Sequence, residues 1–170
     1  MRARECSDDG SVAMTSRSGR AAKTRDPMAL AVEEARAAAA RGEVPVGAVL
    51  VRDGEILASA GNRTLEWHDP TAHAEMLAIR AACEAAASER LPGCDLYVTL
   101  EPCPMCATAI SFARIRRLYF GAADEKMGGV EHGPRIFSQP SCHHRPEIYG
   151  GIREAEMAEM LKAFFKVRRT

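Results

Sequence analysis

The chain has 170 residues, enough for one domain with a substantial hydrophobic core. Its apolar fraction of 46% is ordinary for a globular protein, and no apolar run approaches the roughly 20 residues that span a bilayer. Basic and acidic residues balance at 23 each, so bulk charge gives no support for nucleic-acid binding, and contact with RNA or DNA would need a local basic patch.

Residues 1–25 differ from the rest of the chain in composition. They are rich in Ser, Arg, Gly and Ala and hold almost no bulky apolar side chains, so folding them would not bury enough surface to offset the entropy lost. We therefore expect a disordered tail over 1–25 and one folded domain over 26–170. The tail is basic, as transit peptides are, but Glu5, Asp8 and Asp9 argue against that assignment because transit peptides are poor in acids.

Hydrophobic periodicity and turn signals predict helices that alternate with strands along the remaining chain. Asp26 is a candidate N-cap, Pro27 would occupy the first helical position, and Gly42 follows the end of that helix. Asp53-Gly54, between two runs that favour strands, is a strong hairpin signal. The expected helices cover 27–41, 71–88, 102–113 and 153–168, and the expected strands 46–52, 55–60, 95–100, 117–121 and 147–149, with a loop over 124–145.

This alternation predicts an α/β fold with three layers, in which a sheet lies between two layers of helices. The hairpin makes at least one pair of neighbouring strands antiparallel. The central sheet, of about five strands by this pattern, should therefore be mixed.

The six cysteines bear on both compartment and chemistry. Because the chain shows no export signal, we expect a reducing, cytoplasmic compartment, where a close cysteine pair more often binds metal or does redox chemistry. Cys103 and Cys106 are three residues apart at the predicted start of a helix, so both sulfurs lie on one side of its first turn. The helix N-terminus lowers the pKa of a thiol and so favours the thiolate that zinc binds. His73, near the start of another predicted helix, would be the third ligand of a zinc ion.

Three protein ligands with an open fourth position are the pattern of a catalytic zinc site. Zn²⁺ and two thiolates are together roughly neutral, so this ion should acidify water less than an all-histidine site does, and the reaction needs a nearby base. Glu75, two residues after His73, is placed to take a proton from the attacking water and to return it to the substrate ring and the leaving ammonia. The residues themselves thus indicate zinc, water and a carboxylate base.

Simpler interpretations stay open for each motif. The cysteine pair could be a thioredoxin-like redox pair, although the residues before it lack the usual aromatic. The zinc could be structural, with His68 or Cys94 as a fourth ligand. Four cysteines are expected to be buried small residues or tail residues rather than ligands: Cys6, Cys83, Cys94 and Cys142. Three histidines of the predicted loop could be solvated: His132, His143 and His144.

The combination H-x-E followed by P-C-x-x-C is the signature of zinc deaminases that act on nucleobases. The chain resembles the family of bacterial tRNA-specific adenosine deaminases well beyond that signature, over about 27–169 and without an evident gap. The segments that match are 43–49 (EVPVGAV), Asn62-Arg63, 69–75 (DPTAHAE), 100–103 (LEPC), Met105-Cys106, 120–122 (FGA), Asp124-x-Lys126-x-Gly128, His144-Arg145 and Phe164-Phe165-Lys166-x-Arg168-Arg169.

This resemblance implies a cytidine-deaminase-like fold, a homodimer, and conversion of adenosine to inosine at the wobble position of an arginine tRNA. By position, His73, Cys103 and Cys106 would bind one zinc per chain and Glu75 would shuttle protons. The resemblance also implies substrate-binding residues. Asn62 would hydrogen-bond the flipped-out base, and Ala74 lies beside the zinc ligand His73. The residues that would face the anticodon loop are Asp124, His144 and Arg145, and those near the C-terminus that would bind substrate are Lys166, Arg168 and Arg169.

The closing helix offers the local basic patch that RNA binding requires. The same residues would also fit a solvated, cationic helix end that complements the helix dipole without binding RNA. Two other functions stay as alternatives. One is deamination of a free base or nucleoside such as guanine or cytosine, since Pro104 between the cysteines also occurs in guanine deaminases. The other is a zinc-stabilised RNA-binding module without catalysis, but such a module has no use for Glu75.

Overall fold

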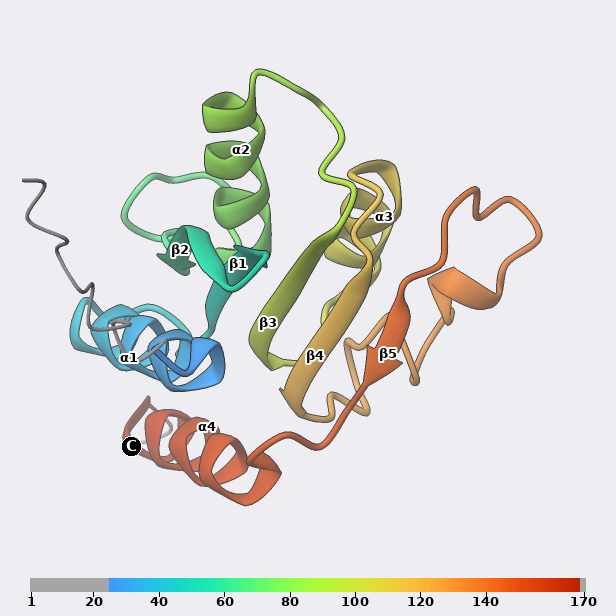
Figure 1. Cartoon of the computed structure of the whole chain (residues 1–170). Helices are drawn as coiled ribbons and strands as arrows, with labels where there is room; N and C mark the ends of the chain where they lie inside the picture. The colour runs from blue at the N-terminus through green and yellow to red at the C-terminus, as the bar shows by residue number, and fades with distance from the viewer. Residues whose placement is uncertain (1–24, 169–170) are drawn as a thin grey trace, which may run out of the picture.

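The computed structural model describes residues 25–168, which form four α-helices, five strands and one short 3-10 helix (Figure 1). The tail predicted over 1–25 lies outside the described residues except for Arg25. None of the described helices is long and apolar enough to cross a membrane. In chain order the elements are α1 (Pro27–Ala40), β1 (Gly47–Arg52), β2 (Glu55–Gly61), α2 (Ala74–Ala86), β3 (Cys94–Leu100), α3 (Pro104–Phe112), β4 (Arg117–Ala122), η1 (Ile136–Ser138), β5 (Glu147–Tyr149) and α4 (Glu154–Arg168).

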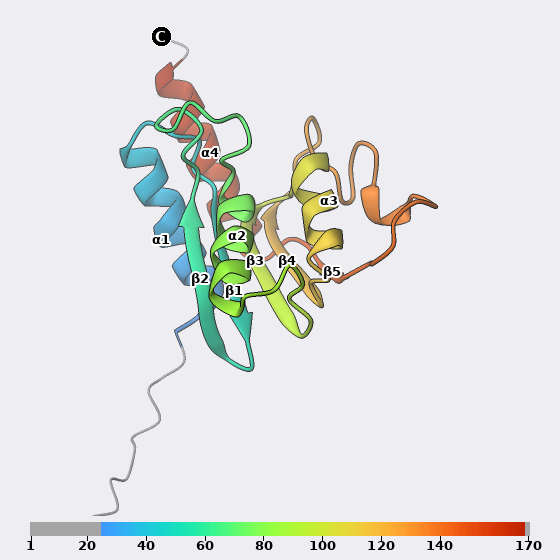
Figure 2. The ribbon, with the colours of Figure 1, turned by 90° about the horizontal axis from the view of Figure 1, so that it is seen from above.

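All five strands belong to one sheet in the order β2-β1-β3-β4-β5. Strand β1 is antiparallel to both β2 and β3, whereas β3, β4 and β5 run parallel to one another. Helices α2 and α3 cover one face of the sheet, and α1 and α4 cover the other (Figures 1 and 2). The prediction of a three-layer α/β fold with a mixed sheet is confirmed.

Local signals at both ends of α1 act as the sequence predicts. The Oδ1 atom of Asp26 accepts a hydrogen bond from the backbone N–H of Met28 at 3.0 Å, and Pro27 occupies the first turn. Beyond the helix, Gly42 has a φ of 86°, which only glycine adopts without strain. The helix therefore begins and ends where capping chemistry allows it.

Glycine is required both in the turn between β1 and β2 and where α1 packs on β1. Asp53 and Gly54 have φ values of 51° and 81°, as a two-residue type I′ hairpin turn requires. At Gly47 an added Cβ would lie 2.0 Å from the carbonyl oxygen of Ala31. The missing side chain thus lets α1 pack directly on β1.

The hydrophobic core has one part on each face of the sheet, because side chains alternate along the strands. On β3, Leu96 and Val98 join the cluster beneath α2 and α3, whereas Tyr97 packs with Val49 and Met28 beneath α1. A smaller cluster around Met157 holds α4 to the rest of this layer. Both pairs of helices are therefore anchored to the sheet by buried apolar contacts.

Helices α2 and α3 start two or three residues later than predicted, and these differences matter for the site. Helix α2 begins at Ala74 instead of 71, because the Oδ1 atom of Asp69 accepts hydrogen bonds from both the N–H and the hydroxyl of Thr71, each at 2.7 Å, which forms a turn. Helix α3 begins at Pro104 instead of 102. The predicted loop over 124–145 also contains the short helix η1.

Candidate active site

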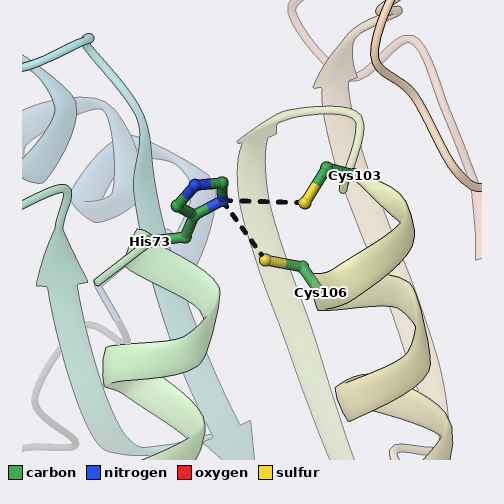
Figure 3. Close-up of side chains that lie close together, drawn as sticks. All are labelled: His73, Cys103 and Cys106. Atoms are coloured by element: carbon green, nitrogen blue, oxygen red, sulfur yellow. Dashed lines mark hydrogen bonds between the residues drawn. The ribbon is translucent and has the colours of Figure 1, made fainter. Parts of the chain in front are cut away.

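Three predicted zinc ligands come together at the starts of α2 and α3 (Figure 3). His73 is the N-cap of α2 and Cys103 the N-cap of α3, both with extended backbone, and Cys106 lies in the first turn of α3. The Nδ1 atom of His73 lies 3.6 Å from Sγ of Cys103 and 3.5 Å from Sγ of Cys106. All three donor atoms lie within 4.8 Å of one another.

This donor set fits zinc. A tetrahedral ion with ordinary Zn–S and Zn–N bond lengths separates its nitrogen and sulfur ligands by about 3.6 Å, which agrees with the distances from Nδ1 to the two sulfurs. Within the described part of the chain, neither His68 nor Cys94 joins the cluster, so the structure does not supply the fourth ligand of a structural site. Three protein donors leave one position open, as in catalytic zinc sites.

Hydrogen bonding within the cluster favours the ligand form of one of the three side chains, the thiolate of Cys103. The Cys106 thiol and His73 hydrogen-bond the sulfur of Cys103 and lower the pKa of Cys103 to about 4. The pKa of Cys106 is raised instead, by its hydrogen bond to Cys103 and by burial. Hydrogen bonding to Cys103 also raises the pKa of His73. One thiolate thus exists before any ion binds, and a divalent ion would take the place of the remaining protons.

Glu75 lies in the first turn of α2 with only 3% of its surface exposed. Burial raises the pKa of its carboxyl to about 7, because the charged form loses its hydration. A carboxyl with a pKa near neutrality can both accept and release a proton during one reaction. The predicted base therefore lies in surroundings that suit a proton shuttle.

The cluster opens into a pocket of about 450 Å³, a size that suits a small molecule or one flipped-out nucleoside. Its lining includes His73, Cys103, Glu75, Asn62, Val46 and Met105. The Oδ1 atom of Asn62 accepts a hydrogen bond from the backbone N–H of Ala74 at 2.8 Å. This bond fixes the orientation of the Asn62 amide beside the pocket, and it places Ala74, which is fully buried, behind that amide.

Asp124 also lines the pocket. Its Oδ1 atom accepts hydrogen bonds from the backbone N–H groups of Lys126 and Met127 at 3.1 and 3.0 Å, so it holds a tight turn. The side chain of Met127, a residue that is 66% exposed, lines the pocket as well. Of these two residues, sequence reasoning identified only Asp124.

The predicted basic patch lies on α4, away from the zinc ligands. The guanidinium of Arg168 donates a hydrogen bond to the carbonyl of Gly42 and lies over the ring of Phe164, 4.3 Å from its centroid. Lys166 is exposed beside a shallow depression on the same helix. Arg169 lies outside the described residues.

The structure does not bring His144 and Arg145 to the pocket. The Nε2 atom of His144 lies 2.5 Å from the carbonyl oxygen of Ile115, and its backbone N–H donates to the Ser111 hydroxyl at 3.3 Å. These contacts hold the segment against the C-terminal end of α3 and the start of β4. Arg145 is exposed next to it, so any RNA contact by this pair would lie outside the catalytic pocket.

Two buried glutamates beside the pocket have roles that the sequence did not reveal. The first is Glu43, which is 1% exposed and precedes β1. Its carboxylate accepts hydrogen bonds from the Thr64 hydroxyl and from the backbone N–H groups of Leu65 and Glu66, at 3.0, 2.9 and 2.9 Å. It therefore holds the loop that carries Asn62. Its sequence signal is an acid that stands four positions before the apolar strand β1.

The second is Glu101, which follows β3 and is 2% exposed. One of its carboxylate oxygens lies 2.7 Å from Nδ1 of His132. His132, which the sequence allowed to be solvated, keeps 35% of its side chain exposed and also lies against this carboxylate. His143, in contrast, is exposed. The contact between Glu101 and His132, which are thirty-one positions apart, leaves no periodic pattern in the sequence.

Comparison with known proteins agrees with this geometry. Residues 22–122 match the cytidine and deoxycytidylate deaminase zinc-binding region. The chain is 64% identical over 142 residues to a tRNA-specific adenosine deaminase of Agrobacterium fabrum, covering 84% of this chain and 93% of that one. A solved structure from work on A-to-I editing by tRNA:A34 deaminases at the wobble position of transfer RNA is 65% identical, with a TM-score of 0.78, over 79% of this chain and 98% of that one. A guanine deaminase of Bacillus subtilis is 32% identical, with a TM-score of 0.58, over 85% and 92%.

Proposed function

The chain belongs to the cytidine and deoxycytidylate deaminase family, and from this premise we propose that it deaminates adenosine to inosine at the wobble position of tRNA. One observation carries the chemistry, namely that Glu75 is buried in the same pocket as the three converging zinc ligands. The substrate rests on the 64% identity to a tRNA-specific adenosine deaminase, twice the identity to the guanine deaminase. The proposed enzyme holds one zinc ion per chain.

The pocket residues divide the reaction between them. Zinc, when held by His73, Cys103 and Cys106, supplies a Lewis acid that lowers the pKa of water. Glu75 takes a proton from the attacking water, delivers it to a ring nitrogen of adenine, and passes a second proton to the departing amino group. The water oxygen forms a bond to C6 while the bond from C6 to the amino nitrogen breaks, so adenosine and water yield inosine and ammonia.

Asn62 orients the base. Because its Oδ1 atom is occupied by the N–H of Ala74, its Nδ2 atom is the group left to donate a hydrogen bond to an acceptor on the purine. The buried N–H of Ala74 keeps the amide from rotating, which makes Ala74 an indirect contributor to substrate binding. Removal of either hydrogen bond would leave a polar group unsatisfied in the pocket.

The nucleotides that flank the target adenosine would lie along a depression that leads from the pocket to α4. Asp124 borders both the pocket and this depression, and Leu161 and Phe165 continue it. Lys166 lines a second depression, which shares Leu161 and Phe165 with the first, and a phosphate there would find a cation. We include Arg168 and Arg169 in this contact, and we leave His144 and Arg145 as a second contact farther along the anticodon stem-loop.

Three finer features belong to the same proposal. The resemblance to bacterial tRNA-specific adenosine deaminases supports an arginine tRNA as the substrate and a homodimer as the active assembly. Phe112, at the end of α3, is 66% exposed, and such a large exposed apolar residue suits a buried position between two subunits. A tRNA substrate supports a cytoplasmic location. Light scattering would test the dimer, and a monomer at micromolar concentration would contradict it.

Incubation with total tRNA, followed by sequencing for inosine, tests the proposed function. We expect inosine at the wobble position of an arginine tRNA with the natural chain and none with the Glu75→Gln variant. Inosine in another tRNA would correct the tRNA identity alone. Release of ammonia from free guanine, without inosine in any tRNA, would replace adenosine deamination with guanine deamination.

A further inference from the structure

Glu101 makes an unusual number of hydrogen bonds to a single segment of the chain. One carboxylate oxygen accepts the backbone N–H groups of residues 130, 131 and 132 at 3.1, 2.8 and 2.9 Å. The other accepts the N–H of Asp124 at 3.0 Å and lies 2.7 Å from the ring of His132. The side chain is fully buried, so the carboxylate has exchanged water for five donors of the 124–132 segment.

The segment is pressed against the residues that carry the metal ligand Cys103. The N–H of Gly129 donates to the carbonyl of Pro102 at 2.8 Å, and a Cβ at Gly129 would lie 2.6 Å from the nitrogen of Pro104. A Cβ at Gly128 would lie 2.6 Å from the carboxylate carbon of Glu101. The backbone thus fits into a space that only glycine at both positions allows.

Between these anchored ends, the segment presents a short exposed tip to the pocket. Glu125, Lys126 and Met127 are exposed, whereas residues 128–130 are buried. Asp124 and Met127 line the edge of the pocket, as described above. The position of this edge therefore depends on the buried hydrogen bonds beneath it and not on packing of its own side chains.

We infer that Glu101 is a positioning residue that holds the 124–132 segment as the substrate-facing wall of the pocket. Both its oxygens are occupied by donors of the segment, so it neither transfers a proton nor binds the base itself. The inference rests on the proposed function, because the wall is assigned to the nucleotide substrate. Its consequence is a role in substrate binding that is separable from the zinc chemistry.

The Glu101→Gln variant tests this role, because glutamine has the same shape but presents an NH₂ group where Asp124 and His132 now meet an oxygen. We expect KM for an anticodon stem-loop to rise about tenfold, kcat to stay within about threefold, and zinc to stay at about one per chain. The Co²⁺-substituted proteins should give the same visible spectrum with and without the substitution, because the ligand set is unchanged.

Asp95→Asn is the matched control. Asp95 is another buried carboxylate, near the start of β3, the strand that Glu101 follows, and it pairs with Arg116 at 2.9 and 2.8 Å. This variant should lose thermal stability without any change in KM. If Glu101→Gln does not fold, His132→Ala decides instead, because it keeps the four backbone bonds and should raise KM about threefold.

Two results would overturn the inference. One is a wild-type KM in the variant that folds, and the other is a fall in kcat with an altered Co²⁺ spectrum at unchanged KM, which would place Glu101 in the metal chemistry. Failure of the proposed function looks different, because the natural chain itself would then form no inosine in the same stem-loop.

Discussion

His73 and Cys103 occupy equivalent positions in two different helices. Each is an N-cap with extended backbone, and neither side chain caps its own helix. A Ser or Asp at such a position would stabilise the helix by about 1 kcal/mol. The chain forgoes this stabilisation twice, and both side chains are thereby left to bind a metal ion.

Loss of one thiol should abolish zinc binding. We expect Cys106→Ala to retain much less than one zinc per chain, because two remaining donors cannot hold the ion against competition from water. Metal analysis after dialysis measures the content. Cys83→Ala is the control, since Cys83 is a half-buried cysteine outside the cluster and its variant should keep the zinc. Full zinc occupancy in Cys106→Ala would remove Cys106 from the ligand set.

Glu75→Gln should separate metal binding from catalysis. The amide keeps the shape of the side chain but cannot accept a proton from water, so kcat should fall by about 10²–10⁴-fold or more. The zinc content and the melting temperature should stay close to those of the natural chain, because Glu75 is not a ligand. Turnover within a few-fold of normal would show that another group moves the proton.

At the scale of elements, the loop after β2 is held by Glu43 more than by its own packing. Burial alone would raise the pKa of the Glu43 carboxyl, but hydrogen bonds from Glu66, Leu65 and Thr64, with the nearby Arg41, outweigh it and leave the pKa below its usual value. A carboxyl whose pKa is lower in the folded state stabilises the fold above its unfolded pKa, and that stabilisation is lost as pH falls through the folded pKa.

Glu43→Gln should therefore lower Tm most at neutral pH and progressively less in acid. Thermal melts of both proteins between pH 7 and pH 3 measure the difference, which should be constant above about pH 5 and shrink below the ordinary glutamate pKa of about 4.3. Glu33→Gln removes only an exposed pair with Arg25 and should change Tm little at any pH. A pH-independent difference for Glu43→Gln would assign its effect to shape and not to charge.

The sequence predicted every strand and α-helix of the described residues, because periodicity, the Asp26 cap and the Asp53-Gly54 turn are local signals. It placed the start of α2 too early, since the competing turn at Asp69 depends on a side-chain hydrogen bond. The zinc ligands and Glu75 were also predictable. His73 and Glu75 lie at the start of one helix, and Cys103 and Cys106 at the start of another, so each pair forms a motif of short spacing. The carboxylates of Glu43 and Glu101 were not, since their partners lie 21 to 31 residues away.

The architecture of the whole molecule explains why ligands thirty or more residues apart in the chain meet. Helices α2 and α3 follow β2 and β3 and lie on the same face of the sheet, so their N-termini point to one place (Figures 2 and 3). Helix propensity or spacing alone does not reveal this meeting, which depends on strand order. In the opposite layer, the last turn of α4 carries the cationic side chains of Lys166 and Arg168.

Deletion of residues 1–24 should leave the domain intact. The Asp26 cap and the exposed pair of Arg25 with Glu33 lie beyond the deleted segment, and that segment has too few bulky apolar residues to contribute to a core. Tm and kcat/KM on a stem-loop should match those of the full chain. A clear fall in Tm on truncation would show that these residues pack against the domain.

The most direct test of the account is turnover of an isolated anticodon stem-loop beside turnover of free bases and nucleosides, with the same zinc-loaded protein. The stem-loop carries adenosine at the wobble position, and the other substrates are adenosine, guanine and cytidine. A loop nucleotide is easily unstacked, and the proposed contacts of the wall and of the α4 cations would engage its neighbours, so inosine should form in the stem-loop with little product from the small molecules. Rapid deamination of guanine with no inosine in the stem-loop would contradict the account.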